Sequence, residues 1–248
     1  MATSAQNSPV VSSAKRVPGT AGQYFYFFMS LLVAAVVIYG FSHTVDQNLV
    51  HANPVRPWLL WVHGSLFSAW VAFFILQSAL VRTRNVPLHR ALGWMGAGLA
   101  ASMTVVGITT AIVMDRFDIG VLHAQGVPAF LIVPLWDIAC FTTFFWLAVA
   151  YRRKPEIHRR LILMATCVLT AAAFGRFPDP RFITEGWYLL GVDGLILLGV
   201  IRDILVTRRV HRTYLYALPV LALGQWIVVH TYTTSAAWWV RIASRILG

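Results

Sequence analysis

The chain has 248 residues, of which 58% are apolar and only 12% are charged, so its composition excludes an ordinary soluble domain. Its formal net charge is +11, but the basic residues lie between long apolar stretches, which argues against a nucleic-acid-binding protein. We expect a polytopic membrane protein that contacts the lipid bilayer and, through its basic loops, anionic lipid headgroups.

The first segment, residues 1–22, is rich in Ser, Ala, Pro and Gly and is predicted to be a flexible polar tail. Seven apolar runs follow within residues 23–234, and about 20 apolar residues are enough to cross a bilayer. Because the loops between them are short, we predict an all-α fold, a bundle of seven transmembrane helices. The runs are Tyr24–Phe41, Trp58–Val81, Ala91–Met114, Pro128–Ala150, Leu161–Phe174, Trp187–Val206 and Tyr214–Val229.

Two further features concern packing. Gly93, Ala97 and Ala101 recur at four-residue spacing in the third run, and small residues at this spacing let helices approach closely, so we expect the third helix to be central. The last segment, residues 235–248, separates an apolar face with Trp239 and Ile242 from a polar one. This pattern predicts either an amphipathic interfacial helix or an extension of the seventh helix, and the adjacent tryptophans favour the interface.

The basic residues predict the orientation of the bundle. With a cytoplasmic amino terminus, 14 Lys and Arg residues lie inside and six lie outside, which follows the positive-inside rule and places the carboxy terminus outside. The inner set is Lys15, Arg16, Arg82, Arg84, Arg90, Arg152, Arg153, Lys154, Arg159, Arg160, Arg202, Arg208, Arg209 and Arg212; the outer set is Arg56, Arg116, Arg176, Arg181, Arg241 and Arg245.

Three His-Arg pairs mark the inner ends of helices three, five and seven. The histidines are His89, His158 and His211, and Asp203 lies near the inner end of the sixth helix. A set of three imidazoles and one carboxylate could hold a metal ion. The positive helix termini and the arginines instead favour anions, such as lipid phosphate or the propionates of a haem. A third interpretation is that the pairs only anchor the helices at the lipid headgroups.

A second group of ionisable residues lies in the outer half of the predicted bilayer. His63, Asp137 and Asp193 are costly there unless they are paired or solvated, so each is a candidate for function. They could line a proton path, ligate a metal or hold a quinone headgroup, or they could form hydrogen bonds that fix the packing. Arg176 could neutralise Asp137 or Asp193, which would make the group a structural ion pair.

Several stretches resemble a family of uncharacterised bacterial seven-helix integral inner-membrane proteins. They are H-G-S-L-F-S-A-W (His63 to Trp70), V-P-L-H-R-A-L-G-W (Val86 to Trp94), K-P-E-I-H-R-R-L-I-L-M-A-T (Lys154 to Thr166), R-V-H-R-T-Y-L-Y at the start of the seventh helix, and A-W-W-V-R-I-A near the end. Arg212 stands where the family pattern has proline. The resemblance covers nearly the whole chain and implies a multi-pass protein of the bacterial inner membrane, without an activity to transfer.

Three functional hypotheses follow. The first is a membrane protein linked to redox chemistry or electron transfer, with a haem or quinone-type cofactor bound by His89 and His158, and with His63 and Asp137 shaping an outer pocket. The second is a non-catalytic accessory subunit of a larger membrane complex. The third is a proton-coupled transporter or a metal-site membrane enzyme.

Overall fold

The computed structural model describes residues 20–184 and 186–248, and within them the chain forms only helices and their connections, which confirms the all-α prediction. Residues 1–19 of the predicted tail lie outside the described residues, and residues 20–22 belong to the first helix. The helices are α1 (Thr20–Ser42), η1, a π-helical turn (Asp46–Val50), α2 (Leu59–Arg82), α3 (Val86–Gly120), α4 (Val127–Phe130), α5 (Ile132–Ala150), α6 (Pro155–Val168), α7 (Ala171–Phe174), α8 (Arg181–Thr184), α9 (Trp187–Thr207), α10 (Arg212–Thr233) and α11 (Ala237–Leu247).

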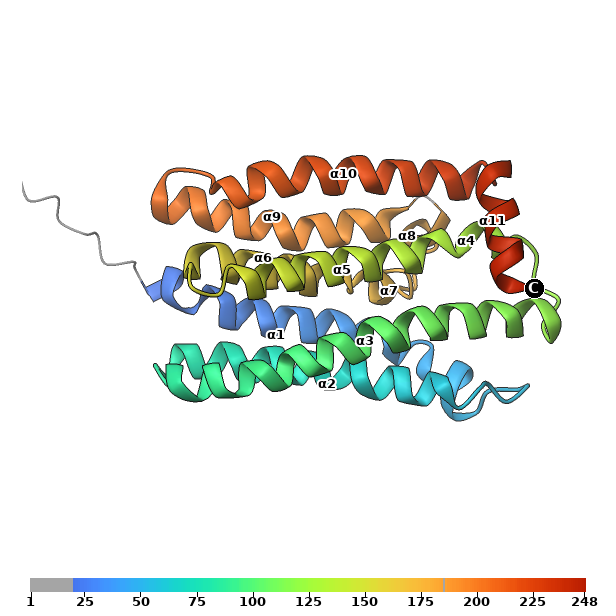
Figure 1. Ribbon diagram of the computed structural model, residues 1–248, viewed down its shortest axis with the longest axis horizontal. Coiled ribbons are helices and arrows are strands. Elements are labelled where there is room, and N and C mark those ends of the chain that lie inside the picture. Colours follow the sequence, from blue (N-terminus) through green and yellow to red (C-terminus); the bar gives the residue numbers. More distant parts are fainter. Residues whose placement is uncertain (1–19, 185) are drawn as a thin grey trace, which may run out of the picture.

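The long helices run along one axis and form an elongated bundle (Figure 1). α2 and α3 form one side, α9 and α10 form the other, and α1, α5 and α6 lie between them. α2 ends where α3 begins, and α6 begins at this same end of the bundle. We call it the basic end, because its helix termini and loops carry Arg82, Arg84, Arg90, Arg152, Arg153, Lys154 and Arg159.

Within the described residues, six segments are long and apolar enough to cross a membrane, which indicates a multi-pass membrane protein. They are Tyr24–Ser42, Leu59–Arg82, Val86–Gly120, Val127–Ala150, Pro155–Phe174 and Arg212–Thr233. α9 has a comparable length, 21 residues, but contains three charged residues and is not among the six. The seventh span therefore stays a prediction.

The most enclosed helix is α6, not α3 as the small-residue spacing predicts. Every residue of α6 from Arg160 to Val168 is buried except Ile162. The small residues of α3 serve other contacts: a Cβ on Gly96 would collide with the ring of Phe73 in α2, and a Cβ on Gly107 would meet Ile138 in α5. Thus α3 packs closely on α2 and α5, while α6 occupies the centre.

Glycine also allows a close approach between α1 and α7. A Cβ on Gly40 would collide with the backbone carbonyl of Ala173, so the two helices touch through their main chains. A backbone carbonyl cannot rotate away as a side chain can, so this contact constrains the position of α1.

The last helix, α11, is separate from α10. The chain turns at Ser235, where φ is 46°, and α11 then crosses the end of the bundle opposite the basic end (Figure 1). Trp239, Ala243 and Leu247 pack on Leu131 in a small second core. Arg116, near the end of α3, donates hydrogen bonds to the carbonyls of Ile246 and Leu247 (2.7 and 2.8 Å) and so satisfies the carboxyl end of α11.

Candidate functional site

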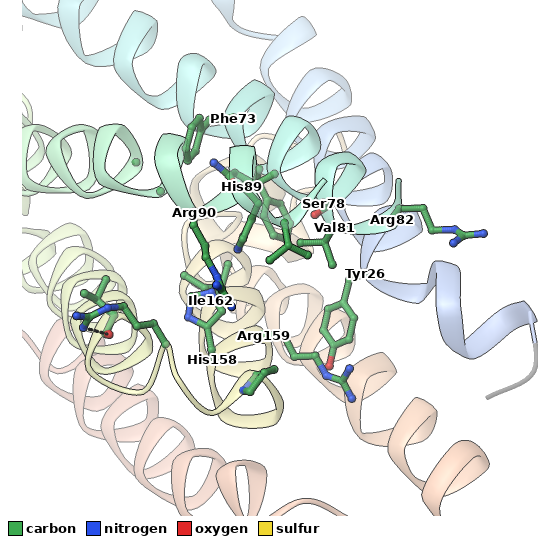
Figure 2. Close-up of a pocket in the computed structure, with 18 of the residues that line it drawn as sticks. Tyr26, Phe73, Ser78, Val81, Arg82, His89, Arg90, His158, Arg159 and Ile162 are labelled. Carbon is green, nitrogen blue, oxygen red and sulfur yellow. Dashed lines mark hydrogen bonds between the residues drawn. The ribbon is translucent and has the colours of Figure 1, made fainter. Parts of the chain in front are cut away.

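A cavity of about 1100 Å³ opens at the basic end. Its wall is built from α1, α2, α3, α5, α6, one residue of α9 and the loops between these helices (Figure 2). Six arginines line it at or near the helix ends, and aromatic residues line it two to three turns further in. The arginines are Arg82, Arg84, Arg90, Arg152, Arg153 and Arg159, and the deeper residues include Trp70, Phe73, Phe74, Ala97 and Phe145.

The charged side chains that line this cavity, apart from the histidines, are all arginines. Arg202 of α9 is a seventh arginine in it, and none of the described residues that line the cavity is an Asp or Glu. A cavity with an apolar interior and a cationic mouth suits a ligand with an apolar body and an anionic end.

Two of the predicted site residues, His89 and His158, come together in this cavity. Each is the fourth residue of its helix, and their ring centroids lie 6.4 Å apart with the ring planes at 79°. Pro87 and Pro155 sit in the first turn of α3 and α6, where proline favours helix initiation, so the sequence places both histidines one turn in from a helix start.

Hydrogen bonding orients the His158 ring. Its Nδ1 lies 2.9 Å from the carbonyl oxygen of Ala148 at the end of α5. A carbonyl only accepts, so Nδ1 carries the proton and donates, and Nε2 takes no part in this hydrogen bond. The Nδ1 of His89 is buried and has no hydrogen-bond partner among the described residues. The pair therefore offers ring nitrogens to a ligand in the cavity.

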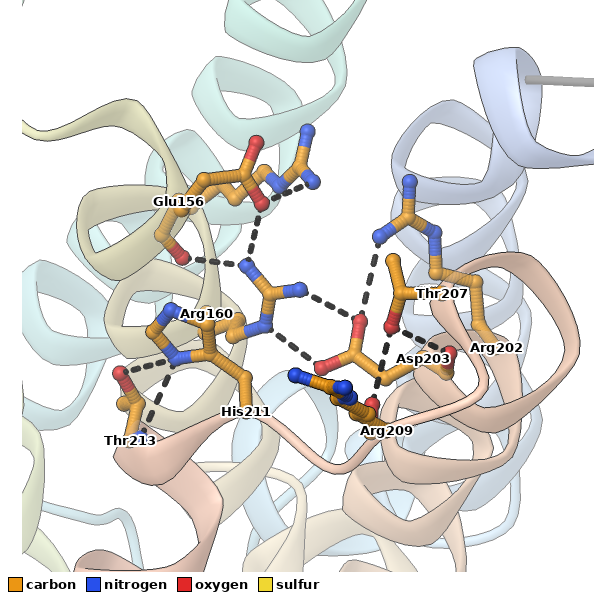
Figure 3. Close-up of polar contacts among 9 residues, drawn as sticks. Glu156, Arg160, Arg202, Asp203, Thr207, Arg209, His211 and Thr213 are labelled. Atoms are coloured by element: carbon orange, nitrogen blue, oxygen red, sulfur yellow. Dashed lines mark hydrogen bonds and ion pairs between the residues drawn. The ribbon is translucent and has the colours of Figure 1, made fainter. Parts of the chain in front are cut away.

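His211 and Asp203 do not join these histidines, so the predicted four-residue metal shell is not assembled. The described residues contain no group of three or more His, Cys, Asp or Glu side chains placed to hold a metal ion. The Nδ1 of His211 instead accepts a hydrogen bond from the backbone N–H of Thr213 (3.2 Å) and caps α10 (Figure 3). Burial, together with the nearby Arg160, lowers the pKa of His211 below its ordinary value.

Asp203 forms an ion pair that could not be predicted from the sequence. Arg160 donates from Nε to one Asp203 oxygen (2.8 Å) and from Nη2 to the other (2.5 Å), and both side chains are almost fully buried (Figure 3). Glu156 accepts a further hydrogen bond from Arg160 (2.8 Å), and Arg202 donates to Asp203 (3.2 Å). The Asp203 carboxylate therefore holds α6 and α9 together through these hydrogen bonds.

The second predicted group lies nearer the opposite end, and its members make separate contacts. His63 stacks on Phe67, with 4.1 Å between ring centroids, and its Nδ1 is buried without a partner among the described residues. Asp193 accepts a hydrogen bond from Gln225 (3.1 Å), which fixes α9 against α10. Asp137 forms no hydrogen bond or ion pair with a described residue. These three side chains are not placed together to hold a metal ion in the described part of the chain.

Arg176 does not neutralise either aspartate, contrary to one interpretation of the sequence. Its Nη1 donates to the carbonyl of Ala172 (2.5 Å), and its guanidinium lies over the ring of Phe41, 4.5 Å from the centroid. Within the described residues it forms no ion pair with Asp137 or Asp193. An arginine at this position is satisfied by a helix end and an aromatic face.

Sequence reasoning missed the polar residues of the cavity wall on α2. Trp70 Nε1 and both amide atoms of Gln77 are buried without partners among the described residues, and both side chains line the cavity. Their spacing of seven residues is a helical signal, but the same spacing is shared by many apolar positions of α2.

Comparison of the chain with protein-family models, with curated proteins and with solved structures found no match.

Proposed function

We propose that the protein is a redox-linked protein of the bacterial inner membrane that binds a haem, non-covalently, between His89 and His158. One observation carries the proposal: the two imidazoles face one cavity with their centroids 6.4 Å apart. Metal–imidazole bonds of about 2.0–2.1 Å on both sides of one ion put two ring centroids roughly 6 Å apart. The separation therefore suits a haem iron that His89 and His158 would hold between them.

The surroundings of the pair support the same cofactor. A hydrogen bond from the far ring nitrogen to a backbone carbonyl is the usual way in which a metal-binding histidine is oriented, and His158 has this bond to Ala148. The arginines of the mouth would pair with the propionates of the haem. When bound, the haem would supply one-electron chemistry, and the protein residues would set its orientation and its access to water.

The dimensions of the cavity agree with this ligand. The lining residues of α3 extend from Val86 to Ala97, a rise of roughly 16 Å along the helix. His89 lies in the outer third of this length, between the arginines of the mouth and the apolar interior. Gly93, one turn beyond His89, presents no side chain to the cavity and leaves space beside the ligand pair.

The proposed membrane arrangement has seven spans, with α9 as the sixth of them. The charges of α9 that oppose insertion are compensated, because Asp203 pairs with Arg160 and Arg202 while Asp193 accepts from Gln225. With seven spans, the basic end faces the cytoplasm by the positive-inside rule, and the carboxy terminus lies on the other side. The bacterial inner membrane is proposed from the sequence resemblance.

A visible absorption spectrum of the detergent-purified protein, before and after dithionite, tests the function. We expect a Soret band, and reduced bands that sharpen, in the wild type and in the control His43→Ala, which alters an exposed histidine outside the cavity. His89→Ala and His158→Ala should each lose the six-coordinate spectrum, because one axial ligand is absent. If folded protein supplied with haem during expression has a flat spectrum, the proposal is wrong and the accessory-subunit hypothesis takes its place.

A further inference from the structure

The α2 wall of the cavity carries polar groups that the histidine pair does not use. The indole Nε1 of Trp70 and both the Oε1 and Nε2 atoms of Gln77 are buried, and they have no hydrogen-bond partner among the described residues. Both residues line the cavity. Folded proteins pair nearly all such atoms, so three unpaired atoms on one wall point to a bound molecule that pairs them.

The chemistry of these atoms limits the ligand. The indole N–H is only a donor, so the ligand must present an acceptor to Trp70. Trp70 is 3% exposed and meets Phe141 and Phe145 edge to face, with centroids 5.1 and 5.5 Å away, so its N–H is held in place. The residues of α2 between Trp70 and Gln77 are all uncharged, so this stretch of the wall is apolar between its two polar side chains.

The spacing of the two residues indicates a ligand with two opposed oxygens. Trp70 and Gln77 are seven residues apart on one face of α2, which is a rise of about 10.5 Å. The carbonyl oxygens of a para-quinone lie about 5 Å apart, since C=O bonds of about 1.2 Å project from opposite corners of the ring. Two separate acceptor oxygens of this kind can pair with two polar side chains that lie on one helix face.

We propose that this wall binds the headgroup of a para-quinone, with one oxygen on Trp70 Nε1 and the other on the Gln77 amide. Phe74 and Phe145, both buried, lie on the same stretch of the wall and offer aromatic surface to the ring. The inference rests on the proposed redox function for its physiological meaning, and on the α2 wall alone for binding. A para-quinone is a redox-active ligand, which is why the inference draws its meaning from the proposed function.

Equilibrium binding of a short-chain para-benzoquinone to the detergent-purified protein tests this inference. We expect saturable binding by the wild type, and no competition from a hydrocarbon of the same size that lacks the two oxygens. Trp70→Phe removes the N–H and keeps an aromatic ring, and Gln77→Leu removes the amide and keeps the shape. Each should weaken binding roughly 3- to 10-fold, the effect of one lost hydrogen bond.

Trp226→Phe is the matched control, because Trp226 is 64% exposed and lies outside the cavity. Its affinity should equal that of the wild type, and thermal midpoints confirm that all the variants are folded. No saturable binding by the wild type, or equal affinity in Trp70→Phe and Gln77→Leu, overturns the inference.

The same variants test the haem proposal and the quinone inference independently of each other. Trp70→Phe should keep the Soret band while it loses quinone affinity, and His89→Ala should lose the normal haem spectrum while it keeps quinone affinity. Quinone binding by a protein with a flat spectrum would support the α2 subsite and contradict the haem site alone.

Discussion

Arg160 and Asp203 are joined by two parallel hydrogen bonds across α6 and α9, although their side chains are only 1% and 0% exposed (Figure 3). Glu156 also pairs with Arg159 and Arg160, and Arg202 pairs with Asp203, so three basic and two acidic side chains form one network at the basic end. A bidentate pair of this kind fixes both the distance and the rotation between two helices.

Removing one partner of the Arg160–Asp203 pair should strongly destabilise the protein. Arg160→Met leaves the buried Asp203 with only the more distant Arg202, and we expect a loss of about 3–5 kcal/mol in the free energy of unfolding. The double variant Arg160→Met/Asp203→Leu removes both charges and should recover most of the loss, since an apolar replacement of a buried pair is often close to neutral. Thermal denaturation in detergent measures both. A single variant as stable as the wild type would contradict the structural role.

Two glycine substitutions should have opposite effects. Gly40→Ala places a methyl group against the Ala173 carbonyl and should destabilise the protein by about 1–3 kcal/mol. Gly64→Ala, in α2, meets nothing within 4 Å and should stabilise the helix by about 0.5–1 kcal/mol. Midpoints of thermal unfolding distinguish the two, and equal shifts would show that α1 does not touch α7.

Filling the cavity should remove its ligands without unfolding the chain. Gly93→Leu projects a side chain from α3 into the cavity, where a Cβ meets nothing within 4 Å. Gly98→Leu, five residues further along α3, is the control, because Gly98 is exposed and does not line the cavity. We expect a fall of at least about tenfold in haem affinity for Gly93→Leu and no change for Gly98→Leu, measured by haem titration. Equal haem affinity in the two variants would place the haem elsewhere.

The cap of α10 should depend on pH. The folded pKa of His211 is below its ordinary value of about 6.5, since burial and Arg160 disfavour the imidazolium. Its stabilisation is therefore present above pH 6.5 and is lost as the pH falls through the folded pKa, when Nδ1 can no longer accept from Thr213. His211→Asn keeps a capping oxygen that does not titrate in this range. The wild type should lose stability relative to this variant between pH 7.5 and 5, and a constant difference would be contrary to the expectation.

The helical architecture could be predicted from the sequence because it follows from local properties. The apolar lengths and the proline positions predict the helices and place His89 and His158 one turn from a helix start. Which helix lies at the centre of the bundle could not be predicted in the same way. The spacing of Gly93 and Ala97 indicates close packing, but it does not say whether a partner helix or a cavity lies opposite.

Pairing between distant residues was the main source of error. Asp203 looks like a metal ligand when it is considered with the three histidines, and its true partner, Arg160, is 43 residues away. Arg160 stands between Arg159 and Leu161 and has no sequence feature that separates it from the other arginines of the basic end. Only the rotation of α6 in the bundle turns its side chain inward. The seven arginines of the cavity wall came together for the same reason, since they belong to separate segments of the chain.

The contact between Gly40 and Ala173 also has a consequence for biosynthesis. α7 is made about 130 residues after Gly40, so at roughly 5–20 residues per second α1 waits some 5 to 30 seconds for this partner. During that interval Gly40 lacks its contact with the Ala173 carbonyl. The contact between α1 and α7 is thus made late, when a helix from the second half of the bundle docks on a helix made well before it.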